Sequence, residues 1–226
     1  YKRVLYVMGN HEFYREVFQE APGLLKDFLK THAPNTRLLD NETEIILLGD
    51  EQIAVLGTTF WATCCVGHPL DEHRIVNAMA DFQVIRTTAT PPPGMTLHDG
   101  TRAFKPLDAY AQHQIAMGFL KTELPKHKRA IVLSHHAPSF DSAAGADHNT
   151  TWMDPAYCSD QVDFIRSNAQ IENWVHGHTH RDENYLIGTC RVLANQHGYP
   201  HERMRQRPFD VMGVDFELKE KANENT

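Results

Sequence analysis

The chain has 226 residues, 41% of them hydrophobic and 9% aromatic, which is enough for one domain with a sizeable core. Its formal net charge of -7 argues against a general electrostatic grip on nucleic acid, and no segment approaches the ~20 apolar residues of a membrane helix. The four cysteines lack the paired spacing of a structural zinc site, so we expect reduced thiols in a cytoplasmic protein. The sequence leaves open whether a signal peptide precedes Tyr1.

The first part of the chain has the pattern of an α/β protein. Residues 4–8 form a short apolar run that ends at Gly9, which predicts a buried strand followed by a tight loop. Apolar residues recur at helical spacing from 13 to 32, and Pro22-Gly23 predicts a break into two helices. Three short apolar runs separated by turn residues then predict strands and a hairpin, at residues 36–39, 44–48 and 52–58.

The middle of the chain contains a long excursion and a strong helix. Residues 61–105 have weak periodicity and the breaker Pro91-Pro92-Pro93-Gly94, so we expect at most short helices there, close to a functional site. Pro106 then begins a helix that ends near Pro125. Its apolar face is predicted to comprise Tyr110, Ile115, Phe119, Leu120 and Leu124.

The last part of the chain returns to strands. We expect a helix around residues 160–168, and strands at residues 130–133, 173–175, 185–187, 191–194 and 211–218. A single domain over residues 1–218 is the simplest organisation, with residues 219–226 as a polar tail.

Three polar motifs follow three of the predicted strands. They are Gly9-Asn10-His11-Glu12, Ser134-His135-His136-Ala137-Pro138 and His176-Gly177-His178-Thr179-His180. Loops that leave the carboxyl ends of strands in an open α/β sheet converge on one crevice, so these side chains are expected to meet. His178 and His180 are two residues apart on one side of an extended loop, and two imidazoles so placed suit a borderline metal ion.

Each motif alone has a simpler interpretation. A single histidine is more often a hydrogen-bonded surface residue than a metal ligand, and Asn10 alone would be a helix N-cap. The order of the three motifs along the chain favours the metal site.

This order resembles the calcineurin-like metallophosphoesterase family over essentially the whole chain. The family pattern is Asp-x-His, Gly-Asp with a further acidic residue, Gly-Asn-His-Glu or Asp, a strand-end His, and Gly-His-x-His. The last three blocks stand here at residues 9–12, 135–136 and 177–180, and the loop around Gly198-Tyr199-Pro200 looks like one in bacterial members. The resemblance implies an α/β fold, an αββα sandwich of mixed sheets flanked by helices, here without its first strands and helix.

The resemblance also implies residue roles. The metal ligands would be Asn10 through its amide oxygen, His135 and His178 on one ion, and His180 on a second. His11 would be a catalytic histidine beside the scissile phosphate, donating a hydrogen bond or a proton to the leaving oxygen. His135 is preferred to His136 as the ligand because it directly ends the strand; His136 and His176 are assigned supporting and structural roles.

The first two family blocks would lie before Gly9. Asp71-Glu72-His73 has matching letters but follows Gly67-His68-Pro69 instead of a buried strand, and Gly49-Asp50 is interpreted as a hairpin turn. We therefore expect that the sequence begins inside a longer protein or that another chain supplies the missing ligands.

The implied function is hydrolysis of a small phosphomonoester or phosphodiester at two metal ions ~3.5–4 Å apart, which lower the pKa of a bridging water. Manganese, iron or zinc would suit these ligands, and no organic cofactor is expected. Two alternatives remain, a catalytically inactive scaffold with the same fold and a one-metal structural site. The sequence leaves the oligomeric state and the particular phosphoester open. The sequence leaves two readings for the excursion residues Trp61, His68, His73 and Arg74, which either line the substrate pocket and set its specificity or pack within the loop; no substrate-binding residue is assigned.

Overall fold

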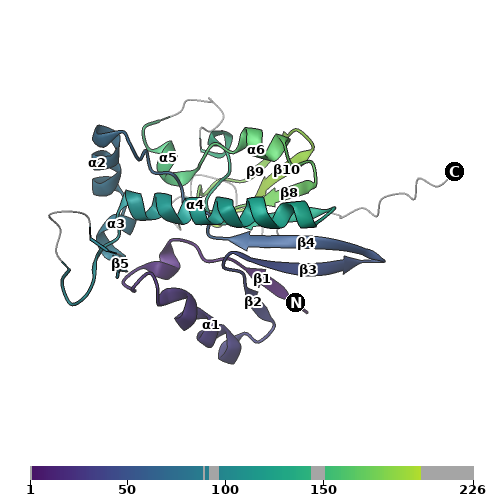
Figure 1. The fold of residues 1–226 in the computed structure, drawn as a ribbon, viewed down its shortest axis with the longest axis horizontal. Coiled ribbons are helices and arrows are strands. Elements are labelled where there is room, and N and C mark those ends of the chain that lie inside the picture. Colours follow the sequence, from purple (N-terminus) through teal and green to yellow (C-terminus); the bar gives the residue numbers. More distant parts are fainter. Residues whose placement is uncertain (1, 89, 92–96, 144–150, 200–226) are drawn as a thin grey trace.

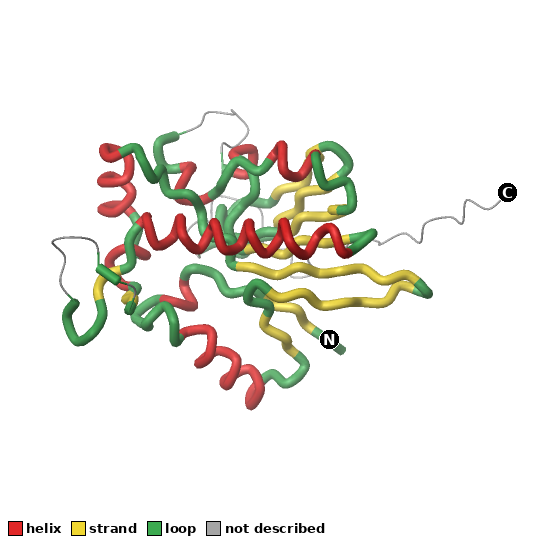
Figure 2. The backbone as a smooth tube through the Cα atoms, viewed as in Figure 1, coloured by secondary structure: helices red, strands yellow, loops and turns green. Residues whose placement is uncertain are grey.

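A six-stranded mixed sheet forms the centre of the fold. The computed structural model describes residues 2–88, 90–91, 97–143 and 151–199. In spatial order the strands are β3 (Glu42–Leu48), β4 (Glu51–Thr58), β7 (Ala130–Ser134), β8 (Ile171–Val175), β10 (Cys190–Ala194) and β9 (Glu183–Ile187). Strands β4, β7, β8 and β10 run parallel, whereas β3 and β9 pair antiparallel at the two edges. The four parallel strands therefore end along one edge of the sheet. Figure 2 shows the strands of the protein in yellow and the helices in red.

The two faces of the sheet pack against different layers. Alternate residues of β4 point to opposite sides, as the strand repeat requires, and both faces are buried. Ala54 and Leu56 join the core beneath helix α4 (Pro106–Glu123), while Ile53 and Val55 pack with residues of a second sheet. Figure 1 shows α4 running across the central sheet.

The second sheet is a parallel pair, β1 (Val4–Tyr6) with β2 (Thr36–Leu38). Helix α1 (Ala21–His32) covers its outer side, where Leu25 and Leu29 pack into the same core as Leu38. The order of layers is thus helix, sheet, sheet, helix, which can be followed in Figure 1 from α1 to α4. This arrangement confirms the mixed α/β fold expected from the sequence.

Helix α4 exposes part of the face that its sequence predicts to be buried. Its buried residues include Ala109, His113, Ala116 and Leu120, whereas Ile115 is 53% exposed. Small alanines at helical spacing let the helix lie close to the sheet, and this turns the bulkier residues 110 and 115 outward. The prediction for Leu120 and Leu124 is confirmed, and that for Tyr110 and Ile115 is wrong.

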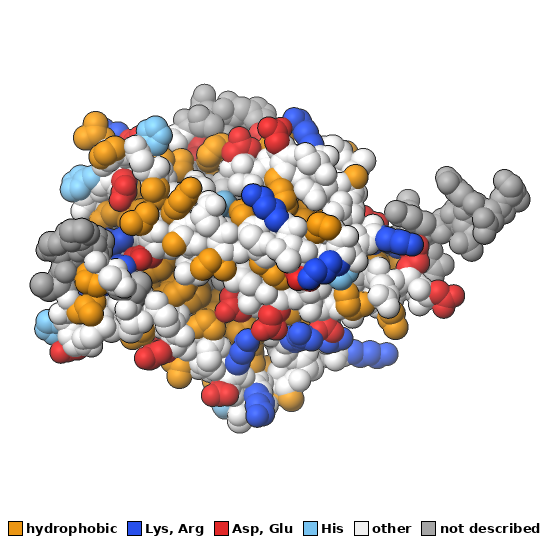
Figure 3. Space-filling model, viewed as in Figure 1, with side chains coloured by type: hydrophobic (Ala, Val, Ile, Leu, Met, Phe, Trp, Pro, Cys, Tyr) orange, Lys and Arg blue, Asp and Glu red, His pale blue; other side chains and the backbone are white. Residues whose placement is uncertain are grey.

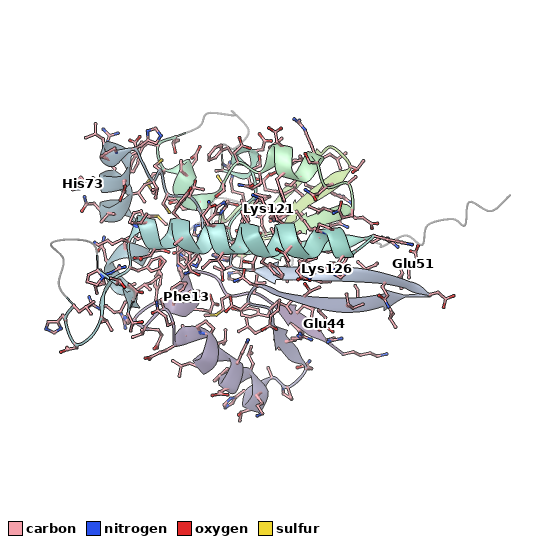
Figure 4. All side chains as sticks on the ribbon, in the orientation of Figure 1. Phe13, Glu44, Glu51, His73, Lys121 and Lys126 are labelled. Atoms are coloured by element: carbon pink, nitrogen blue, oxygen red, sulfur yellow. The ribbon has the colours of Figure 1, made fainter. Side chains whose placement is uncertain are left out.

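The excursion between β4 and α4 forms a second small core. It contains α2 (Pro69–Ala78), α3 (Asp81–Val84) and the hairpin of β5 (Arg86–Thr87) with β6 (Arg102–Ala103). Phe18 stacks on Phe104 at 4.9 Å between ring centroids, and Trp61 packs against both rings. Figure 4 shows Phe13, from the same cluster, inside the molecule and His73 of α2 at its outer edge.

The remaining elements are short. They are the 3-10 helices His11–Phe13, Leu124–Lys126 and Phe140–Ser142, with α5 (Asp154–Tyr157) and α6 (Val162–Arg166). One helix, not two, occupies residues 13–32 beyond the 3-10 turn, because Pro22 and Gly23 lie in the first turn of α1, where proline is tolerated. The predicted strand at 211–218 and the tail at 219–226 lie outside the described residues; the other predicted strands are confirmed within about three residues at their ends.

The surface mixes both signs of charge. On the face in Figure 3, Lys and Arg side chains lie among Asp and Glu side chains. Glu44, for example, pairs with both Arg3 and Arg37. Among the described residues, no helix has the length and apolar character required to cross a membrane.

Candidate functional site

Parallel pairing brings two of the three histidine motifs together. Strands β7 and β8 are neighbours with Leu133 opposite Val175, so the loops that follow them leave the same edge of the sheet. The backbone N–H of Gly177 donates to the carbonyl oxygen of His135 at 3.0 Å and ties these loops to each other. The loop after β1 reaches the same place, where it carries Asn10.

Three side-chain atoms that can each offer a lone pair to a metal ion lie together at this edge of the sheet. The Nε2 atom of His135 lies 2.9 Å from Oδ1 of Asn10 and 3.0 Å from Nδ1 of His178. Asn10 is 3% exposed, and its side chain makes no helix-capping hydrogen bond. Asn10 thus stands at the N-cap position of the 3-10 helix His11–Phe13, but its amide contacts the histidine cluster instead of capping the helix.

The two imidazoles of this cluster are held neutral. Burial lowers the pKa of His135 well below its usual value, and the neighbouring rings of His136 and His11 lower it further. Burial, His136 and His135 do the same to the pKa of His178. Neutral imidazole is the form of histidine that binds metal ions, so both rings keep a lone pair for a ligand bond at neutral pH.

The donor geometry suits a metal ion. Ligands at right angles around an ion at ~2.1 Å lie ~3 Å apart, which matches the two distances from His135 Nε2 to Asn10 Oδ1 and to His178 Nδ1. Among the described residues, no group of three His, Cys, Asp or Glu side chains is placed to hold a metal. The cluster is instead a mixed set of two imidazoles and one amide oxygen, and these donors fit ions of the manganese, iron or zinc class.

Two glycines, Gly9 and Gly177, lie directly against the imidazole ring of His135. A Cβ atom on Gly9 would lie 2.6 Å from Cε1 of His135, and one on Gly177 would lie 3.3 Å from its Nδ1. Glu12 fixes the first of these loops, because its carboxylate accepts a hydrogen bond from the Gly9 N–H at 2.9 Å and another from the Tyr6 hydroxyl. The glycines of the sequence motifs thus provide the close approach that the cluster needs.

We predict that Gly9→Ala displaces the His135 ring and lowers the free energy of unfolding by ~1–3 kcal/mol, because the new methyl group overpacks a closed site. Gly23→Ala is the matched control: its Cβ would meet nothing within 4 Å in helix α1. The control should leave stability unchanged or raise it by ~0.4–1 kcal/mol. Urea unfolding of both variants measures the difference, and equal stabilities would show that the Gly9 contact is not restrictive.

The loop that carries His178 and His180 has an unusual backbone. Both residues have positive φ angles, 70° and 55°, in a backbone region that residues other than glycine rarely adopt. Gln196, which follows β10, supports this shape: its Oε1 accepts from the His180 N–H at 2.7 Å, and its Nε2 donates to Thr179 Oγ1 at 2.8 Å. Sequence reasoning missed Gln196, because its contact with His180 joins two residues that are 16 positions apart.

His11 and His180 line an open cavity beside the donor cluster. The cavity has a volume of about 680 Å³ and is also lined by Asn10, Tyr14, Asp81, His135, His178 and Tyr199. The Tyr199 hydroxyl lies 3.3 Å from Nε2 of His11, and the Tyr199 ring packs edge-on against His180 at 4.7 Å between centroids. His11 is exposed and His180 is half-buried, so both rings are accessible from the cavity.

The other two histidines of the motifs are engaged elsewhere. His136 is buried, which lowers its pKa to about 3, and its Nδ1 lies 3.3 Å from the Thr59 carbonyl oxygen. His176 places Nδ1 2.9 Å from the Gly177 carbonyl oxygen and Nε2 2.9 Å from the Ser142 hydroxyl. Because a carbonyl oxygen only accepts, Nδ1 of His176 carries the proton and Nε2 accepts from Ser142.

The excursion reaches the site through residues other than the four considered from the sequence. Ala78, Met79, Ala80 and Asp81 line the cavity, whereas Trp61, His68, His73 and Arg74 are absent from its described lining. Trp61 belongs to the aromatic core, and His73 lies at the outer edge of the molecule (Figure 4). Asp81 is 2% exposed and accepts a hydrogen bond from Asn10 Nδ2 at 2.9 Å. No local pattern in the sequence marks it.

The fold is that of known hydrolases. The crystal structure of phosphopantetheinyl hydrolase from Mycobacterium tuberculosis matches with a TM-score of 0.63 and 13% identity, over 92% of this chain and 73% of that one. Both are mixed α/β folds with a central sheet flanked by helices. At this identity the similarity concerns the fold alone.

Sequence comparisons add a viral relative. The uncharacterised protein L509 of Acanthamoeba polyphaga mimivirus is 26% identical over 228 residues, which covers 95% of this chain and 75% of that protein. No protein-family model matches the chain. The similarity to phosphopantetheinyl hydrolase therefore stands on the fold alone.

Proposed function

We propose that this protein hydrolyses a small phosphomonoester or phosphodiester with the help of bound metal ions. The observation that carries the proposal is the cluster in which His135 Nε2 lies 2.9 Å from Asn10 Oδ1 and 3.0 Å from His178 Nδ1, in the lining of an open cavity. The cluster stands at the strand ends of a fold shared with a hydrolase, where ligands of α/β sheets bind.

Four side chains are proposed as ligands. Asn10, His135 and His178 would hold one ion, and His180, which lines the same cavity, would reach a second. When bound, such ions supply Lewis-acid polarisation of the phosphoryl oxygens and a nucleophile at neutral pH. A second ion needs ligands beyond His180, and the family pattern assigns them to acidic blocks that would precede Gly9.

His11 is the proposed proton donor. Its ring is exposed in the cavity, and its Nε2 is next to the Tyr199 hydroxyl at 3.3 Å and is not among the three clustered donors. A histidine in this place can donate a hydrogen bond or a proton to the leaving oxygen as the phosphorus–oxygen bond breaks. Tyr14 packs on the other side of the His11 ring, at 4.4 Å between centroids, and limits its orientation.

The cavity limits the size of the substrate. Its volume of about 680 Å³ is within the ~300–1,000 Å³ typical of small-molecule sites. We therefore propose a small phosphoester as the substrate, whose phosphoryl group lies over the donor cluster and whose organic part lies along the wall formed by Tyr199 and residues 78–80.

A one-metal structural site is the second candidate. It is favoured by one observation: Asn10, His135 and His178 each have a ligand atom within 3.0 Å of a ligand atom of another member of this group, so these three residues alone could hold one ion. Such a site would stabilise the fold without turnover.

The two candidates differ in one experiment. The full-length gene product is stripped of metal, supplied with Mn²⁺, and assayed with bis(p-nitrophenyl) phosphate and p-nitrophenyl phosphate while its melting temperature is recorded. Metal-dependent release of nitrophenol, abolished by a chelator, is the result we expect. A metal-dependent rise in melting temperature with no hydrolysis of either ester would favour the structural site and overturn the enzymatic proposal.

A further inference from the structure

Asp81 is a buried carboxylate whose contacts converge on Asn10. It begins helix α3 in the excursion and is 2% exposed. Its Oδ1 accepts a hydrogen bond from Nδ2 of Asn10 at 2.9 Å, and its Oδ2 accepts one from the Tyr14 hydroxyl at 3.1 Å. Both oxygens of the carboxylate are thus turned toward the Gly-Asn-His-Glu loop.

The contact with Asp81 decides which end of the Asn10 amide faces the histidines. An ionised carboxylate only accepts hydrogen bonds, so the NH₂ end of the amide must point at Asp81. The oxygen end then points at His135, 2.9 Å from its Nε2. The reverse orientation would place two acceptors against each other at Asp81 and would direct N–H groups, which carry no free lone pair, into the donor cluster.

A second effect acts through the same hydrogen bond. A carboxylate that accepts from the amide NH₂ pulls positive charge toward the nitrogen and leaves the amide oxygen more negative, which strengthens it as a ligand. Asp81 therefore acts on the cluster without entering it, in the way that outer carboxylates orient metal-binding histidines.

We infer that Asp81 is a positioning residue that fixes the Asn10 amide with its oxygen toward the cation. The inference rests on the proposed metal site. It explains why a segment far from the three motifs is folded against them. Asp81 touches neither the proposed cation nor the phosphate, so its effect should appear first in metal affinity.

The test measures Mn²⁺ affinity of the full-length protein by titration calorimetry. Asp81→Ala is expected to weaken binding by about 10- to 100-fold, as losses of outer-shell partners do. Asp81→Asn should recover most of the affinity, because its amide oxygen still accepts from Asn10. Asp71→Ala is the matched control: this aspartate lies in α2 of the same excursion, its carboxylate contacts Arg74 at 3.4 Å, and the variant should bind Mn²⁺ as wild type does.

A double-mutant comparison isolates the orientation effect. In an Asn10→Ala background no side-chain amide is left for Asp81 to orient. There, Asp81→Ala should cause no further loss of Mn²⁺ affinity. An equal loss in both backgrounds would show that Asp81 supports the fold in general and would overturn the inference.

If Asp81→Ala does not fold, an NMR measurement on the wild-type protein tests the orientation of the Asn10 amide instead. The side-chain NH₂ protons of Asn10, identified by their disappearance in Asn10→Asp, should be protected from solvent exchange both without metal and with Zn²⁺. Rapid exchange would overturn the inference. If the wild-type protein binds neither ion, the proposed metal site fails as well, whereas wild-type affinity in Asp81→Ala defeats this inference alone.

Discussion

Replacing His135 by alanine is expected to lower Mn²⁺ affinity by more than about 100-fold, because a lost ligand should exceed the 10- to 100-fold effect of outer-shell partners. Its Nε2 is the atom that lies beside both other donors, at 2.9 Å from Asn10 Oδ1 and 3.0 Å from His178 Nδ1. Without it the remaining two donors share no common neighbour, and hydrolysis of the chromogenic esters should fall to background.

The control for this variant is His73→Ala. His73 is an exposed histidine of α2 whose side chain lies at the outer edge of the molecule (Figure 4). Titration calorimetry should give wild-type Mn²⁺ affinity for His73→Ala, and circular dichroism should show both variants folded. A folded His135→Ala protein with wild-type affinity would place the metal site elsewhere.

Replacing His11 by asparagine is expected to lower kcat by ~10²–10⁴-fold while leaving bound metal unchanged, since general acid catalysis contributes about that much. The ring of His11 is exposed in the cavity and stands apart from the three donors, so its loss removes no proposed ligand. The measurement is steady-state kinetics with added Mn²⁺, together with metal analysis of the purified variant.

His32→Ala serves as the control for His11. His32 is exposed at the end of α1, where its Nδ1 contacts the Phe28 carbonyl oxygen at 3.0 Å. It should retain both kcat and metal content. Loss of metal from His11→Asn in parallel with loss of turnover would mean that His11 is a ligand and that its proposed proton-donor role is wrong.

Local patterns were sufficient for most of the fold. Strands 52–58 and 130–133 were predictable because short apolar runs bounded by turn residues can bury both faces only in a central sheet. The edge strand over 44–48 was predictable from its apolar residues and the hairpin turn at Gly49-Asp50. The buried face of α4 was not predictable from apolar spacing. The small side chains of Ala109 and Ala116 face the sheet because they let the helix pack close to it, and Ile115 then points outward. This packing requirement arises only in the folded protein.

For the candidate site as well, the sequence predicted some residues and the tertiary structure was needed for the others. The sequence by itself determined the three motifs and their order, and parallel strands convert that order into proximity because their carboxyl ends share one edge. Asp81 and Gln196 became visible only in the tertiary structure. Their partners, Asn10 and His180, are 71 and 16 residues away, and a hydrogen bond between such distant positions leaves no periodic or local trace in the chain. Which end of the Asn10 amide faces the histidines is likewise decided by a contact that exists only after folding, since a carboxylate on α3 must first be brought to the loop after β1.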